Sequence, residues 1–232
     1  MKSFILSLLL LFCSTGYLSA LEKQEFRTWV STAGSSIEAR LVGEPTAYQL
    51  TLEKKDGTTF VLKPSQLSAE DRKYLEKLKA LANSPKRILF IGNSYTRGIS
   101  GMVKKMVAAS PYSGVELAFV TPGGKTLDFH LQNEATMDKI REGNWDIVVL
   151  QDQSQTPAVF PDKFHNAAKG IDKIIDDAGA RTVFYETWGR RDGDKMNIQR
   201  FPDYKSMQRA LSDSYKKAAR SCGAELAPVG QA

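Results

Sequence analysis

The sequence predicts an α/β protein, with a doubly wound parallel sheet that follows a small β domain. In the C-terminal two thirds, short runs of continuous apolar residues alternate with amphipathic segments, which is typical of buried parallel strands alternating with helices. In the preceding part, apolar residues recur at every second position, which is typical of strands with one buried face. A short polar break at residues 83–85 separates the two patterns. We therefore expect two domains, over residues 21–82 and 86–232.

The first twenty residues have the three-part pattern of a secretory signal. Lys2 precedes an apolar run from Phe4 to Phe12, and small and polar residues follow up to Ala20. We expect cleavage near Ala20 and a secreted or periplasmic protein that meets the membrane only through this segment. The apolar run is shorter than the roughly 20 residues that span a bilayer. Cys13 raises the alternative of a lipoprotein, which the bulky Phe12 before it disfavours.

Composition argues against several classes of function. Without the leader one cysteine remains, Cys222, so no internal disulfide can form and the fold depends on its core. The 32 Lys and Arg are interleaved with 26 Asp and Glu, which is typical of solvated faces and not of a nucleic-acid-binding stripe. The sequence has neither metal-ligand spacing of His, Cys and carboxylates nor a phosphate-binding glycine loop after the first parallel strand. We therefore expect no cofactor and no nucleic-acid partner.

The N-terminal pattern predicts a small β-barrel or sheet with a closing helix. Asp56-Gly57 lies between two alternating segments and predicts a tight hairpin turn, because glycine supplies the positive φ. Residues 67–82 predict a helix with Ser68 as N-cap and Asp71 in the capping-box position. The strand residues expected to share the buried faces are Ile37, Ala39, Leu41, Tyr48, Leu50, Leu52, Phe60 and Leu62.

This first domain resembles the Sla1 homology domain 1 (SHD1), an SH3-like module. The resemblance rests on Arg27 and Trp29, the strands after them, the KKDG turn and the LSAEDRKYL segment, and it covers about fifty residues. It implies a small SH3-like β domain with a possible peptide or protein partner. Trp29 could be an aromatic residue of the binding face or a core tryptophan of a small barrel, and we favour the core.

The sequence pattern of the second domain predicts five strands and four helices in alternation. The strands are expected at 87–92, 115–120, 145–151, 181–188 and 224–230, and the helices at 100–110, 126–143, 164–179 and 204–223. Sites in such sheets lie at the carboxyl ends of the strands. Four polar or glycine-rich segments are therefore expected to meet at one edge of the sheet: Ser94, Gly123-Gly124, Gln151 to Ser154, and Trp188-Gly189.

Three of these segments resemble the conserved blocks of the SGNH or GDSL hydrolase superfamily. GNSYT after the first strand resembles block I, with Asn93 in place of the usual aspartate. GGKT resembles block II, and its register points to Gly124 as the donor glycine. VVLQDQS occupies block III, where Gln151 stands for the usual glycine and Gln153 for the usual asparagine. Together with TWGRRDGD, FPDYKSMQ and APVG, the match covers residues 86–232 and looks like a secreted bacterial branch of the superfamily.

The resemblance implies a flavodoxin-like fold and a serine esterase. Ser94 would be the nucleophile, and the backbone N–H groups of Ser94 and Gly124 with the Gln153 amide would bind the oxyanion. The substrate would be a small ester or a carbohydrate that carries acyl or acetyl groups. The alternative for Ser94 is a simple helix cap, and the three blocks together favour the nucleophile.

The base of this family lies in an Asp-x-x-His motif after the last strand, and no such motif follows the last predicted strand here; the one Asp-x-x-His in the sequence is Asp162 to His165, at the start of a predicted helix. Of the two histidines, His130 could line the cleft as a substitute, whereas His165 is expected on a helix face. Asp152 could act as a substitute acid or base, although no spacing argument supports it. We expect either a truncated esterase or a protein that has lost its base, and we favour truncation. The alternative function is non-catalytic binding of glycans or peptides by the cleft and the SHD1-like module.

Overall fold

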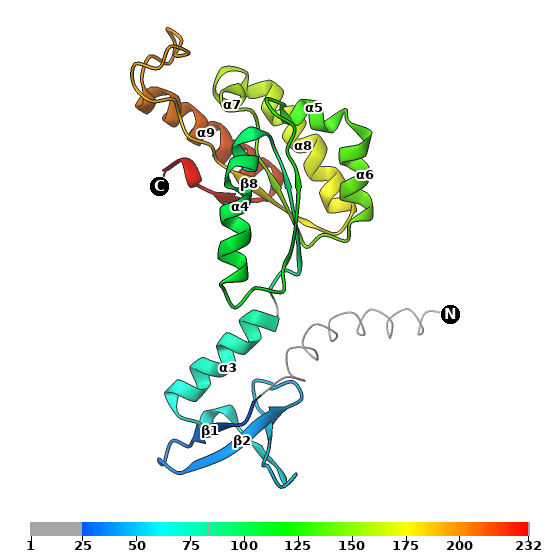
Figure 1. Ribbon diagram of the computed structural model, residues 1–232, viewed down its shortest axis with the longest axis vertical. Coiled ribbons are helices and arrows are strands. Elements are labelled where there is room, and N and C mark those ends of the chain that lie inside the picture. Colours follow the sequence, from blue (N-terminus) through cyan, green and yellow to red (C-terminus); the bar gives the residue numbers. More distant parts are fainter. Residues whose placement is uncertain (1–24, 83, 232) are drawn as a thin grey trace, which may run out of the picture. The chain divides into compact units, whose positions relative to one another are not determined.

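The structure is a computed structural model, which describes residues 25–82 and 84–231. The expected signal peptide and Cys13 lie outside the described residues. The chain divides into two compact units, one ending at Ser84 and one beginning at Pro85 (Figure 1). Within the described ranges, none of the helices combines the length and the apolar character needed to cross a bilayer.

The N-terminal unit is a four-stranded antiparallel sheet with one long helix. Its strands pair in chain order and are β1 (Arg27–Val30), β2 (Ser36–Val42), β3 (Leu50–Glu53) and β4 (Thr59–Leu62), followed by η1 (Pro64–Gln66) and α3 (Ala69–Ala82). Gly57 has a φ of +82° in the turn between β3 and β4, as Asp56-Gly57 predicted. Tyr48 was expected in a strand, but it precedes β3 and is 83% exposed. This prediction was wrong because the Thr46 hydroxyl accepts the N–H of Tyr48 and forms a local turn.

Trp29 belongs to the core of the N-terminal unit. Its side chain is 1% exposed, and its indole N–H donates to the carbonyl of Ala39 at 3.0 Å. This burial confirms the core interpretation of Trp29. The other buried apolar residues of this core are Ala39, Leu41, Leu50, Leu52, Leu67 and Leu75. The SH3-like character of the unit stays a prediction.

Asp71 joins the start of α3 to the sheet. Its backbone N–H donates to the Ser68 hydroxyl at 3.2 Å, which confirms the predicted cap. Its carboxylate accepts the Val30 N–H at 2.7 Å and pairs with the Arg27 guanidinium at 2.8 Å. The Asp71 side chain is only 3% exposed, so one buried carboxylate holds a helix terminus, a strand and a cation.

The C-terminal unit contains a five-stranded parallel sheet, which confirms the predicted α/β fold. The strands are β5 (Arg87–Ile91), β6 (Glu116–Val120), β7 (Ile147–Leu150), β8 (Arg181–Tyr185) and β9 (Glu225–Ala227). Their order is β6-β5-β7-β8-β9, which is the flavodoxin-like order. The direction of strand addition reverses at β5 and β7, and α/β sheets bind ligands outside the carboxyl ends of the strands at such a point.

Helices cover both faces of this sheet. They are α4 (Ser94–Ala108), α5 (Leu127–Leu131), α6 (Glu134–Glu142), α7 (Thr156–Val159), α8 (Pro161–Asp177) and α9 (Tyr204–Cys222), with η2 (Val229–Gln231) after β9. α8 packs against α5, α6 and α9, and Figure 1 shows α4 on the opposite side of the sheet from α5, α6 and α8. The single helix expected over 126–143 is two, because the Asn133 side chain accepts the Thr136 N–H and begins a new helix.

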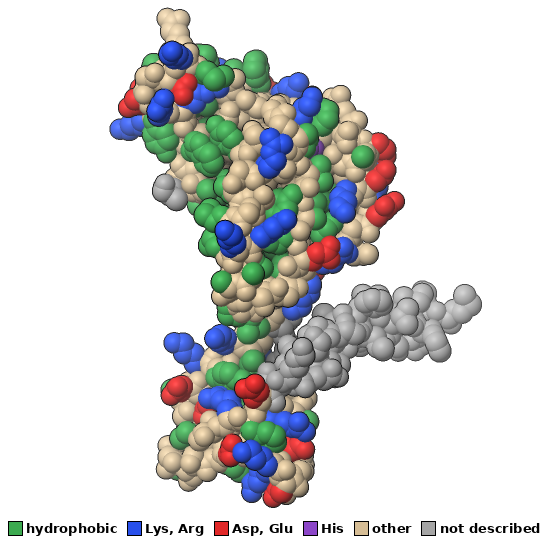
Figure 2. Space-filling view, viewed as in Figure 1, with side chains coloured by type: hydrophobic (Ala, Val, Ile, Leu, Met, Phe, Trp, Pro, Cys, Tyr) green, Lys and Arg blue, Asp and Glu red, His purple; other side chains and the backbone are tan. Residues whose placement is uncertain are grey.

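The two faces of the sheet differ in burial. Leu89, Ile91 and Phe184 are fully buried in the core that includes α8 and α9. On the other face Phe90 and Phe119 stack with their centroids 4.8 Å apart, and Lys104 of α4 lies over the Phe119 ring. These two phenylalanines are only partly buried, and Figure 2 shows hydrophobic side chains gathered around α4.

Candidate active site

A cleft of about 680 Å³ lies at the carboxyl ends of the strands. Its lining includes Ser94 after β5, Gly124 after β6, Gln153 after β7 and Trp188 after β8. The four segments that the sequence predicted to meet therefore contribute to one cleft. The structure brings the expected nucleophile and the two expected oxyanion donors together there.

Ser94 is the first residue of α4. Its predecessor Asn93 is the N-cap, whose side-chain oxygen accepts the Tyr95 N–H at 3.1 Å. The Ser94 backbone N–H thus lies in the first turn, where N–H groups lack partners within the helix. Ser94 is exposed, and no described residue hydrogen-bonds its hydroxyl. The helix expected at 100–110 begins at the serine itself, so cap and nucleophile position are adjacent residues.

Gln151 stands where block III of the family usually has a glycine, and its side chain has a structural role here. Its side-chain oxygen accepts the Asn93 N–H at 3.0 Å and the Thr96 hydroxyl at 2.8 Å. A Cβ added at Gly92 would lie 2.6 Å from that oxygen and 2.4 Å from the Thr96 hydroxyl. The buried Gln151 amide therefore occupies the space beside Gly92 and fixes the loop that carries Ser94.

Gly124 is held close to this loop by its neighbour. The carbonyl of Lys125 accepts the Asn93 side-chain N–H at 3.0 Å, which joins the segment after β6 to the segment after β5. Gly124 itself has a φ of +68°, a left-handed conformation that favours glycine. The sequence expectation for Gly124 rested on register alone, and this link is the physical basis for its place in the cleft.

Gln153 has a defined amide orientation. Its side-chain oxygen accepts the Gln155 N–H at 3.0 Å, and its side-chain nitrogen donates to the Ser154 hydroxyl at 3.2 Å. An amide nitrogen carries two N–H groups, so one of them remains for a ligand. The longer arm of glutamine is thereby anchored at the start of α7.

Asp152 is a buried carboxylate beside the cleft. It is 1% exposed, and its Oδ1 accepts the N–H groups of Leu127 at 3.1 Å and Gln153 at 2.5 Å. Its Oδ2 has no partner among the described residues. Burial raises the pKa of Asp152 to about 7, although both backbone hydrogen bonds oppose this shift. Asp152 does not line the cleft, so it links two of its segments and does not face a substrate.

The structure does not bring His130 to the cleft, which corrects the expectation that it serves as base. His130 is fully buried, and its Nε2 donates to the Gly92 carbonyl at 2.9 Å while its Nδ1 lies 3.3 Å from the Thr136 hydroxyl. Burial also lowers the pKa of His130. The ring holds the loop before Ser94 and does not reach the serine.

His165 also lies away from the cleft, in α8. Its Nε2 is 3.1 Å from both the carbonyl and the hydroxyl of Ser214 in α9, and burial lowers the pKa of His165. Across the described ranges, no group of three or more His, Cys, Asp or Glu is placed to hold a metal ion.

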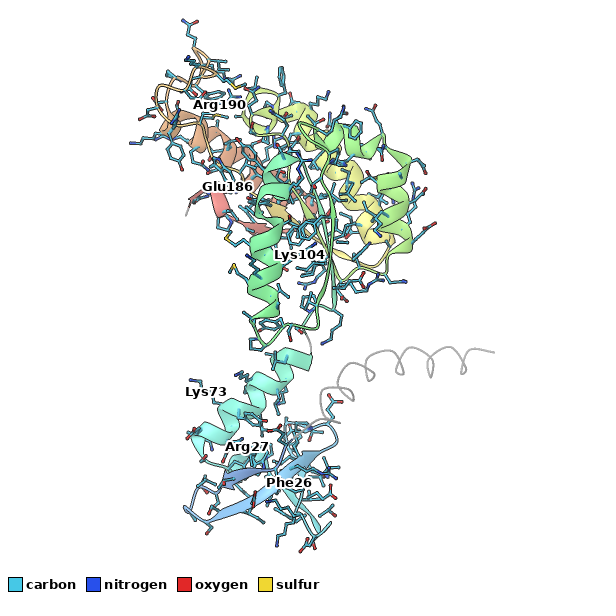
Figure 3. The ribbon with its side chains drawn as sticks, viewed as in Figure 1. Phe26, Arg27, Lys73, Lys104, Glu186 and Arg190 are labelled. Carbon is cyan, nitrogen blue, oxygen red and sulfur yellow. The ribbon has the colours of Figure 1, made fainter. Side chains whose placement is uncertain are left out.

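The far wall of the cleft, formed by Tyr95, Trp188 and the loop after β8, had no predicted role in the reaction. Tyr95 and Trp188 stack there with their centroids 4.6 Å apart and an interplanar angle of 9°. Arg190 and Arg191 also line the cleft, and Figure 3 shows Arg190 in the loop between β8 and α9. The available signal was the motif TWGRRDGD directly after a predicted strand.

Comparison with known proteins supports the fold of the C-terminal unit. No protein-family model matches the sequence, and no curated protein matches it. Among solved structures, a protein assigned as an SGNH hydrolase from Slackia heliotrinireducens is 27% identical, with a TM-score of 0.54, and the match covers 62% of this chain and 78% of that one. A DUF4886 family protein from Bacteroides uniformis is 16% identical, with a TM-score of 0.52, and the match covers 62% of this chain and 67% of that one. These likenesses support an SGNH hydrolase-like fold for the unit that carries Ser94.

Proposed function

We propose that the C-terminal unit is a secreted serine hydrolase of acyl esters, including acetyl esters of carbohydrates. The observation that carries this proposal is the common cleft of Ser94, Gly124 and Gln153 at the switch point of the sheet. The similarity to a protein assigned as an SGNH hydrolase supports the same reaction class. Secretion rests on the sequence pattern of residues 1–20.

The proposed reaction begins with attack of the Ser94 oxygen on the ester carbonyl carbon. A base takes the hydroxyl proton, the carbonyl oxygen becomes an oxyanion, and the alcohol then leaves with a proton to give an acyl-enzyme. The Ser94 and Gly124 N–H groups and the free N–H of the Gln153 amide are the donors in reach of the cleft. Each such donor is worth about 3 kcal/mol of barrier. Water then releases the acid and restores the serine.

Neither histidine of the chain is placed to act as the base in the first step. His130 and His165 are engaged elsewhere, and the one Asp-x-x-His of the sequence, Asp162 to His165, lies in α8 outside the cleft lining. General-base assistance is worth about 10² to 10⁴ in rate. We therefore expect only slow ester hydrolysis by these 232 residues, and a clear increase when a diffusible base is added.

The test is Ser94-dependent turnover of p-nitrophenyl acetate with and without imidazole. Because imidazole cleaves this ester by itself, the quantity compared is the rate of wild type minus that of Ser94→Ala at the same imidazole concentration. Ser100→Ala is the matched control, since Ser100 lies on the same helix and its hydroxyl donates to the Arg97 carbonyl. A wild-type rate equal to that of Ser94→Ala, together with no covalent labelling of Ser94 by a fluorophosphonate, would refute the hydrolase proposal.

A second candidate is a non-catalytic binding protein. The free Ser94 hydroxyl, with no base bonded to it, favours this alternative. In this case the cleft would bind a glycan or peptide without cleaving it, and the SHD1-like unit would bind a peptide. Ligand binding without reaction at Ser94 under the imidazole conditions would identify this outcome.

A further inference from the structure

The far wall of the cleft combines an aromatic surface with two cations. Trp188 is 37% exposed, and one face of its indole is covered by the parallel Tyr95 ring. Stacking leaves few orientations for the indole, so it forms a rigid apolar surface within the cleft. Such a surface fits the flat C–H face of a pyranose ring.

The two cations follow Trp188 and Gly189 in the chain. Arg190 and Arg191 both line the cleft, and Asp194 is the one carboxylate of the lining. Among the residues that the structure describes, neither arginine forms an ion pair, and Asp194 accepts the Met196 N–H instead. The lining therefore carries two positive charges and one negative charge.

The loop that presents the arginines is anchored at both ends. At its start, a Cβ at Gly189 would lie 2.9 Å from the Tyr204 carbonyl, so the backbone approaches α9 closely. The Gly189 N–H donates at 2.7 Å to the Gln208 side chain, which in turn donates to the buried Glu186 carboxylate at 2.8 Å. Figure 3 shows Glu186 at the end of β8, the strand from which the loop with Arg190 departs.

Within the loop, further hydrogen bonds define its path. The Arg191 carbonyl accepts the Asp194 N–H and a side-chain N–H of Asn197. The Asp192 carboxylate accepts the Tyr204 N–H at 2.7 Å. Arg190 donates to the Met196 carbonyl, whereas the Arg191 guanidinium has no protein partner among the described residues. Arg191 is thus presented to the cleft as a free planar donor.

We propose that the cleft selects an anionic sugar, with the pyranose ring on Trp188 and its carboxylate on the guanidinium of Arg191. Guanidinium and carboxylate match as two parallel N–H···O bonds, and a partly enclosed cleft screens that pair less than bulk water does. This inference rests on the proposed hydrolase in placing the sugar ester toward Ser94. The recognition itself does not require catalysis.

Binding measurements test the inference without turnover. Trigalacturonate and its fully methyl-esterified form share the same rings and differ in charge, and their affinities are compared by calorimetry on the Ser94→Ala protein. We expect the acid to bind about tenfold more tightly at low salt, with the preference reduced at 0.5 M salt. Trp188→Ala should weaken both ligands. A sulfated oligosaccharide without carboxylates, if preferred over the uronate, would contradict the carboxylate assignment.

Arg191→Gln should abolish the preference for the acid and leave the affinity for the methyl ester unchanged. Arg200→Gln is the matched control, because Arg200 is an exposed arginine of the same loop outside the cleft lining. Equal affinities for the two ligands, or a preference that survives in Arg191→Gln, would overturn the inference. Failure of Ser94 to react while the charge preference holds would refute the hydrolase alone, and reaction without a preference would refute this inference alone.

Discussion

The two units bury carboxylates in different surroundings. In the N-terminal unit, Asp71 pairs with the Arg27 guanidinium at 2.8 Å. In the α/β unit, Asp152 and Glu186 have only neutral donors among the described residues: backbone N–H groups for Asp152 and the side chains of Gln208, Ser212 and Gln231 for Glu186. Both of these residues lie just beyond the carboxyl ends of strands, beside the cleft.

This difference indicates that Asp71 has a purely structural role, whereas Asp152 and Glu186 support the cleft. A buried carboxylate without a cation costs free energy unless hydrogen bonds satisfy it. Asp71 is compensated by charge and fastens a helix to a sheet. Asp152 and Glu186 instead orient backbone segments that carry Gln153 and Arg190. Proteins accept such local costs at functional sites and offset them elsewhere.

The largest expected effect concerns Asp152 and pH. A pKa raised from 3.8 to about 7 means that the folded state holds this proton more tightly than the unfolded state. Stability from this group is therefore full near pH 4 and declines as pH rises to about 7, by about 4 kcal/mol in total. Asp152→Asn cannot ionise, so its free energy of unfolding should not show this decline.

The measurement is urea unfolding of both proteins from pH 4 to 8. Subtracting the variant from the wild type removes the contributions of His130 and His165, whose lowered pKa values give the opposite slope below pH 6.5. Parallel curves for the two proteins would show that Asp152 ionises freely, and the contrast with Asp71 would then be lost.

A somewhat smaller effect is expected at Glu186. Glu186→Ala removes the acceptor for Gln208, Ser212 and Gln231 and should destabilise the α/β unit by about 3 kcal/mol, because buried donors are left unsatisfied. Glu186→Gln keeps one acceptor oxygen and should cost less. Urea unfolding at pH 7 measures both variants. If the two lose the same stability, the hydrogen bonds are not the cause.

A loss of about 2 kcal/mol is expected for Asp71→Asn, which keeps an acceptor for the Val30 N–H but breaks the ion pair with Arg27. The Arg27 guanidinium also lies over the Trp29 and Tyr74 rings, and these contacts remain in the variant, so the loss stays moderate. The transition of the N-terminal unit should shift and that of the α/β unit should not. A shift of both transitions would contradict separate stabilisation of the two units.

The smallest effect is expected for an exposed pair in α8. Lys173 and Asp177 lie 2.9 Å apart with side chains 75% and 65% exposed, and such pairs contribute less than about 0.5 kcal/mol. Asp177→Asn should leave the unfolding midpoint nearly unchanged at 0.15 M salt. A loss above 1 kcal/mol would show that burial is not what distinguishes the carboxylates compared above.

The local sequence pattern was sufficient to predict the strands of the parallel sheet and most of the segments that line the cleft. Continuous apolar runs such as residues 87–92 predicted parallel strands, because strands covered on both faces need apolar residues at every position. Polar residues directly after those strands predicted the edge at which Ser94, Gly124 and Gln153 meet, because parallel strands end at the same edge. The Asp56-Gly57 turn followed from the backbone freedom of glycine.

Other features depended on contacts between distant residues. The sequence alone determined which segments are strands and which residues follow them, since those signals lie within a few positions. Only the tertiary structure decided that His130 is buried against Gly92 and that Gln151 fills the space beside that glycine. It also decided that Trp188 stacks on Tyr95 in the wall of the cleft. The physical reason is that burial and hydrogen-bond partners are set by side chains separated by 38 to 93 positions, which no local pattern records.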